Sequence, residues 1–102
     1  MSNWVEIGSL SDIPPLGARV VRNGEQDIAV FRNARDEVFA LDDACPHRQG
    51  KLSQGIVHDR SVTCPLHNWK IDLGSGEALG PDEGCTGRFD IKVEEGIIYL
   101  AL

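Results

Sequence analysis

Two short cysteine and histidine motifs constrain this chain more than any other feature of its sequence. Cys45 and His47 form a Cys-x-His motif, and Cys64 and His67 form a Cys-x-x-His motif, with residues 48–63 between them. We call these motifs the first and second ligand boxes. In each box a proline follows the cysteine, and its fixed φ and missing N–H favour a tight, non-helical loop. The pattern therefore predicts two loops, each of which offers one thiolate and one imidazole.

The mixture of ligand types favours a [2Fe-2S] cluster. A cluster with one iron held by two thiolates and the other by two imidazoles needs one ligand of each type from each loop. We therefore assign Cys45 and Cys64 to one iron, and His47 and His67 to the other. Two thiolates cancel the charge of the oxidised cluster core, whereas four thiolates would leave the site negative. Because a neutral site accepts an electron more readily, these ligands suit electron transfer at a raised potential.

Two other chemistries use the same residue types. Two cysteines and two histidines can hold a single zinc ion, which would make the chain a structural interaction module. Zinc motifs, however, more often pair their cysteines as Cys-x-x-Cys. A Cys-His pair also suggests nucleophilic catalysis, but a nucleophile gives no reason for a second cysteine and histidine at matched spacing. A measurement of bound iron distinguishes a cluster from both alternatives, the zinc site and the nucleophilic cysteine.

Composition limits the class of protein. A chain of 102 residues has room for one domain. Its 10 Lys and Arg against 16 Asp and Glu give a net charge of −6, which argues against nucleic acid or anionic lipid as the main partner. The longest apolar run, residues 97–102, is far too short for a membrane helix, and the N-terminus does not resemble a secretion signal. We therefore expect a cytoplasmic protein, in which three cysteines serve metal binding better than disulfides.

The rest of the chain reads as short strands separated by turns, without helical apolar periodicity. Glu95 and Gly96 predict the turn of a hairpin, and residues 34–37 join the strands of a second hairpin. We therefore expect an all-β fold, an antiparallel sandwich or barrel whose site is built on loops. The predicted strands cover residues 4–7, 19–22, 28–33, 38–41, 56–58, 61–63, 68–72, 88–93 and 97–100.

At the two ligand boxes the chain resembles the Rieske family, whose motif is Cys-x-His followed by Cys-x-x-His. The resemblance covers nearly the whole chain and implies one domain over residues 1–102, with a small cluster-binding subdomain at about residues 44–73. Respiratory members carry an extra cysteine in each box, and these two cysteines form a disulfide. This chain has Gly50 and Leu66 at the matching positions. They also carry a serine where this chain has Trp69. These departures imply a soluble member whose reduction potential is low for the Rieske family.

Two soluble groups of that family compete. Residues 74–85 end in Asp-Glu-Gly-Cys and look like the small subunit of assimilatory NAD(P)H nitrite reductase. The alternative is the ferredoxin component of a ring-hydroxylating dioxygenase. The first resemblance implies a large partner subunit with flavin, siroheme and an iron-sulfur cluster, which reduces nitrite to ammonia in nitrate assimilation. This chain would not be a complete enzyme alone and would contribute electron transfer or structural support.

Five further residues are candidates for a role at the site or at an interface. His58 lies in neither box, so a surface or turn role is favoured over a fifth ligand. Cys85 could lie near the cluster or an interface, but a single cysteine in a loop is more often a small buried residue. Trp69 is expected to pack under the cluster loop and exclude water. The acids at residues 82–83 could contact the large subunit or only aid solubility.

Overall fold

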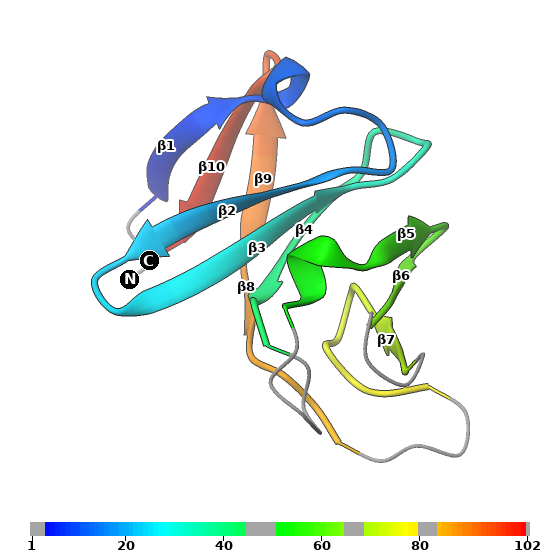
Figure 1. Cartoon of the computed structure of the whole chain (residues 1–102). Coiled ribbons are helices and arrows are strands. Elements are labelled where there is room, and N and C mark those ends of the chain that lie inside the picture. Colours follow the sequence, from blue (N-terminus) through cyan, green and yellow to red (C-terminus); the bar gives the residue numbers. More distant parts are fainter. Residues whose placement is uncertain (1–3, 45–50, 65–68, 80–83, 102) are drawn as a thin grey trace.

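The described residues form three antiparallel sheets and two short 3-10 helices (Figure 1). A computed structural model describes residues 4–44, 51–64, 69–79 and 84–101. In chain order the elements are β1 (Trp4–Ser9), η1 (Leu10–Asp12), β2 (Ala18–Asn23), β3 (Gln26–Arg32), β4 (Val38–Asp42), η2 (Leu52–Gln54), β5 (Ile56–His58), β6 (Ser61–Thr63), β7 (Lys70–Asp72), β8 (Arg88–Phe89), β9 (Ile91–Glu94) and β10 (Ile97–Ala101). The expected all-β fold is confirmed. Within those described ranges, no helix is long and apolar enough to cross a membrane.

The sheets are arranged in layers around the β3–β4 hairpin. The first sheet has the order β1-β10-β9, the second β2-β3-β4-β8, and the third β5-β6-β7. The small third sheet lies to one side of the second (Figure 1), and every strand pair in the three sheets is antiparallel. In chain order, the first ligand box precedes η2 and β5, and the second follows β6.

Strand β3 is buried on both of its faces. Ile28, Ala29, Val30 and Phe31 are each 0% exposed, although they are consecutive. Because side chains alternate across a strand, Ala29 and Phe31 enter one core and Ile28 and Val30 enter another. The first core also contains Phe39, Leu41, Leu52, Val57, Val62, Cys64, Ile71 and Leu73, and the second contains Ile13, Ala40, Ile98 and Leu100.

One predicted strand is wrong as a single element. Residues 88–93 form two strands, because β8 pairs with β4 in the second sheet and β9 pairs with β10 in the first. The chain changes sheets at Asp90, whose carbonyl accepts a hydrogen bond from the Ala101 N–H at 2.9 Å. Sequence patterning also missed the early start of β3. Asn23 pairs with Gln26 across a two-residue turn in which Gly24 has φ +64°.

Both predicted hairpins are confirmed. Glu95 and Gly96 have φ values of 51° and 79°, and they connect paired residues of β9 and β10. Positive φ at both central residues is typical of the type I′ turn, whose twist matches that of the flanking strands. Residues 33–37 connect β3 to β4.

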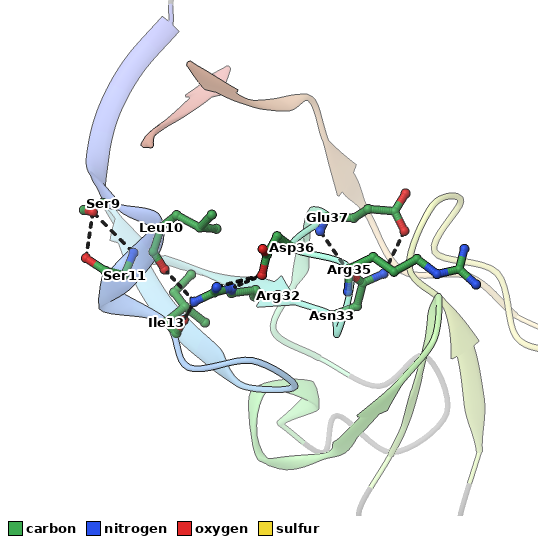
Figure 2. A network of polar contacts seen from close by, with 9 residues as sticks. All are labelled: Ser9, Leu10, Ser11, Ile13, Arg32, Asn33, Arg35, Asp36 and Glu37. Carbon is green, nitrogen blue, oxygen red and sulfur yellow. Dashed lines mark hydrogen bonds and ion pairs between the residues drawn. The ribbon is translucent and has the colours of Figure 1, made fainter. Parts of the chain in front are cut away.

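The β3–β4 turn is held by a buried asparagine (Figure 2). The Asn33 side chain is 0% exposed and takes part in four hydrogen bonds. Its Nδ2 donates to Glu37 Oε1 at 2.9 Å and to the Asp59 carbonyl at 3.1 Å. Its Oδ1 accepts from the backbone N–H groups of Arg35 at 3.0 Å and Glu37 at 2.9 Å. The contact with Asp59 ties this turn to the hairpin of β5 and β6.

Candidate metal centre

The ends of the first ligand box are joined by a buried carboxylate. Cys45 and His47 lie outside the described residues, but the chain is described up to Ala44 and again from residue 51. Asp43 is 7% exposed, and its carboxylate accepts hydrogen bonds from the Ser53 N–H at 2.7 Å and the Ser53 hydroxyl at 2.8 Å. Because a charged acceptor strengthens both bonds, the described chain segments before and after the first box are held side by side at Asp43 and Ser53.

The second ligand box is closed by a backbone hydrogen bond. Strand β6 leads directly into Cys64, which is 0% exposed and belongs to the first core. The Cys64 N–H donates to the Trp69 carbonyl at 2.6 Å. His67 lies between these two residues, outside the described part of the chain. Trp69 is half-buried and packs against the same core, and its position under the cluster loop stays a prediction.

Gly55 brings the segment after the first box against the residue before the second. A Cβ atom at Gly55 would lie 2.3 Å from the Thr63 carbonyl oxygen and 3.1 Å from the Leu52 carbonyl oxygen. Only a residue without a side chain permits this approach. Thr63 directly precedes Cys64. The segment that follows the first box therefore lies next to the residue that leads into the second box, as a shared site requires.

The described residues of this site suit an iron-sulfur cluster. Its ligand set requires thiolates at ordered positions, and Cys64 provides one at the end of a strand, inside an apolar core. Leu52 and Trp69 belong to or pack against this core, so water is excluded around the cysteine. Within the described ranges no three His, Cys, Asp or Glu side chains form a group that could hold a metal ion. That finding does not address the predicted set, because Cys45, His47 and His67 lie outside those ranges.

Two residues considered as possible extra site residues lie on the surface. His58 is exposed in β5, and its Nε2 lies 3.0 Å from Thr63 Oγ1 in a side-chain hydrogen bond. Cys85 is also exposed, so the expectation of a small buried cysteine is wrong. The reason is that the chain returns beside the third sheet after β7, where Cys85 forms an isolated bridge with the exposed Glu77. The acids at residues 82–83 lie outside the described residues.

Three residues that support the site were missed at the sequence level. Asp43 and Ser53 are separated by nine residues and carry no motif that links them. Gly55 precedes an apolar pair and reads as an ordinary turn residue. The position of Asp43, two residues before Cys45, was the available signal, because a loop that carries ligands needs fixed ends.

Comparisons with known proteins show the family of this chain. The Rieske [2Fe-2S] domain family matches residues 3–90. The anthranilate 1,2-dioxygenase ferredoxin subunit of Burkholderia cepacia is 40% identical over 103 residues, covering 98% of this chain and 93% of that protein. The 4beta-methylsterol monooxygenase of Methylococcus capsulatus is 42% identical over 108 residues, covering 95% of this chain. This chain spans only 29% of the length of that monooxygenase.

A solved structure also has a similar fold. A crystal structure assigned to the small subunit of NADPH nitrite reductase superimposes with a TM-score of 0.87 at 25% identity, covering 98% of this chain and 99% of that one. The family match covers most of the chain, and the fold, the buried Cys64 and the two closed boxes fit the cofactor of that family. The chain therefore belongs to the Rieske [2Fe-2S] family and is an electron-transfer protein whose cofactor is a [2Fe-2S] cluster.

Proposed function

We propose that this chain is the small subunit of a cytoplasmic NAD(P)H nitrite reductase. Its cluster would be held by Cys45 and Cys64 on one iron and by His47 and His67 on the other. The observation that carries the proposal is residues 74–85, whose sequence looks like that subunit. The described part of this segment adds an edge to the third sheet, because Ala78 bridges to Ile71 and Cys85 to Glu77. The match along 99% of a structure assigned to such a subunit supports the same proposal.

The protein's own residues hold and shield the cofactor. When bound, the cluster supplies a one-electron relay at a potential that mixed thiolate and imidazole ligation raises. Asp43 and Ser53 fix the ends of the first box, and the Cys64 N–H fixes the second box through the Trp69 carbonyl. Leu52 and Cys64 are fully buried, which keeps solvent from the thiolate side. Lower solvent access and fixed ligands tune the potential of such a site.

A large subunit with flavin, siroheme and an iron-sulfur cluster would complete the enzyme. That subunit would draw electrons from NADH or NADPH and reduce nitrite to ammonia. The small chain would exchange electrons with it through the cluster.

A second candidate is the ferredoxin component of a ring-hydroxylating dioxygenase. The observation in its favour is the 40% identity to the anthranilate 1,2-dioxygenase ferredoxin subunit along 93% of that protein. This identity exceeds the 25% found with the nitrite reductase subunit structure. Both candidates use the same cluster, so the partner alone separates them.

Reconstitution with each partner tests the proposal. The purified chain, with about two irons and two sulfides bound, is mixed with the nitrite reductase large subunit, and NAD(P)H-dependent nitrite consumption is measured. In parallel it is mixed with a dioxygenase reductase and oxygenase, and aromatic hydroxylation is measured. We expect the wild-type chain to support nitrite reduction only. Restored hydroxylation without any effect on nitrite reduction would replace the proposal with the ferredoxin candidate.

The ligand assignment has its own control. His67→Ala should abolish the visible spectrum of the cluster, whereas His58→Ala should preserve it because His58 lies outside both boxes, on the exposed face of β5. Equal loss in both variants, or no loss in either, would contradict the assignment.

A further inference from the structure

A groove lies on the side of the molecule where the first and second sheets meet the β5–β6 turn. Its volume is about 420 Å³, within the range of sites that hold ligands or partner side chains. The lining comes from β1, from β4, from the segment that crosses from β8 to β9, and from the β5–β6 turn and the residues after β7, which lie at the same end of the third sheet. The lining includes Trp4, Phe39, Arg60, Arg88 and Asp90.

Aromatic rings and cations are combined in this groove. The Arg60 guanidinium lies 5.5 Å from the centre of the Phe39 ring. At another part of the lining, Trp4 is 41% exposed, and the Lys92 ammonium lies 4.6 Å from the centre of its ring. Tryptophan, other aromatic residues and arginine are the types enriched at the energetic centres of protein interfaces. The groove therefore has the composition of a protein-binding surface.

The charge of the groove is opposite to that of the chain. Arg60 and Arg88 line it against one acid, Asp90, although the whole chain carries −6. The ion pairs that engage these cations are exposed: Arg60 Nη1 lies 4.0 Å from Glu37 Oε2, and Arg88 Nη2 lies 3.2 Å from Asp90 Oδ1. Exposed pairs of this kind contribute little to stability, so an incoming carboxylate can replace them readily.

The groove is separate from the ligand boxes. Arg60 lies in the turn of the β5–β6 hairpin, beyond the His58–Ser61 pair, whereas Cys64 follows the Ile56–Thr63 pair at the other end. None of the lining residues belongs to the described segments that directly flank either box. A partner bound in the groove would therefore leave the surface near the cluster available for electron exchange.

We propose that this groove binds an acidic segment of the large subunit, a carboxylate of which pairs with Arg60 or Arg88. The proposal rests on the proposed function, because it names the nitrite reductase large subunit as the partner. In this proposal the large subunit attaches at the groove, and electrons are exchanged at the end of the molecule that carries the cluster.

A charge reversal with a matched control tests this proposal. Arg60→Glu is compared with Arg22→Glu, because Arg22 also makes a long, exposed ion pair, 3.9 Å from Asp27, and does not line the groove. The cluster-loaded chain is titrated against the purified large subunit, and the dissociation constant is measured at several salt concentrations. We expect Arg60→Glu to weaken binding about tenfold and to flatten the salt dependence. Arg22→Glu should bind as the wild type does, and the visible spectrum and reduction potential should be unchanged in both variants.

The outcomes separate the possible failures. If the wild-type chain does not bind the large subunit, the proposed function fails and this assignment of the groove fails with it. If the wild-type chain binds and Arg60→Glu weakens binding no more than Arg22→Glu does, only the groove assignment is overturned. Sedimentation of the chain alone is measured in parallel. A dimer that Arg60→Glu dissociates would assign the groove to a second copy of this chain and would also overturn the proposal.

Discussion

Replacing Gly55 by alanine should destabilise the fold and impair cluster binding together. The added Cβ would lie 2.3 Å from the Thr63 carbonyl oxygen, 2.9 Å from Val62 Cγ2 and 3.1 Å from the Leu52 carbonyl oxygen. Two of these atoms belong to the backbone and cannot rotate away. An ordinary contact begins at 3.4 Å, so the Thr63 carbonyl would have to move by about 1 Å, which disturbs the segment that leads into Cys64.

The size of the effect follows from two opposing terms. Gly55 has φ −81° and ψ 179°, which alanine adopts without strain, so the substitution alone would stabilise by about 0.4–1 kcal/mol through the unfolded state. Overpacking of a tight site costs about 1–3 kcal/mol, and more where the backbone must move. We therefore expect a net loss of about 2 kcal/mol, which lowers Tm by about 8–16 °C in a domain of this size.

Calorimetry and cluster content measure this effect against a matched glycine. Gly87→Ala is the control, because the nearest atom to its added Cβ is the Asp42 Cβ at 3.9 Å. The control should unfold at the wild-type temperature or slightly above and should retain its iron and sulfide. Gly55→Ala should unfold earlier and bind less iron. If Gly55→Ala keeps both the wild-type Tm and the wild-type iron content, then the close approach of these two segments is not what brings the boxes together.

Three further substitutions probe the site and its support. Asp43→Ala should speed the loss of iron to a chelator about tenfold, as for other residues that support metal ligands. Asp72→Ala is the control, because it removes a carboxylate that accepts a hydrogen bond from the Ser75 N–H at 2.9 Å, and it should lose iron at the wild-type rate. Equal rates in the two variants would contradict the role of Asp43. Cys64→Ser should abolish the visible absorbance of the cluster, and a wild-type spectrum would refute its assignment as a ligand. Asn33→Ala removes four hydrogen bonds from a fully buried side chain and should lower the free energy of unfolding by about 3 kcal/mol; denaturant titration showing less than about 1 kcal/mol would contradict this.

The local features of the fold could be predicted because local chemistry determines them. Strands β5 and β6 have the predicted bounds, and the Glu95-Gly96 turn forms where expected, since turn residues and side-chain alternation act over a few positions. The division of residues 88–93 at Asp90 could not be predicted, because both halves have strand-like sequence and only their partners differ.

The supporting contacts of the site are non-local, and for that reason the sequence does not reveal them. The Asp43–Ser53 contact and the approach of Gly55 to Thr63 depend on how separate segments pair. Cys85 was misjudged for a similar reason, because its exposure depends on the path of the chain after β7, where it pairs with Glu77. The ligand set itself stays a prediction for Cys45, His47 and His67, which the motif spacing indicates and which lie outside the described residues.

Because β3 is buried on both of its faces, it also determines how cooperatively this protein should unfold. Ala29 and Phe31 complete the core that contains Cys64, while Ile28 and Val30 complete the core beneath β10. Neither core can lose its order without exposing one face of the same strand, so we expect a single cooperative unit in native-state hydrogen exchange. A cofactor that binds only the folded state stabilises that whole unit. Loading the cluster should therefore slow amide exchange as far away as Ile98 and Leu100, in a sheet that carries neither ligand box.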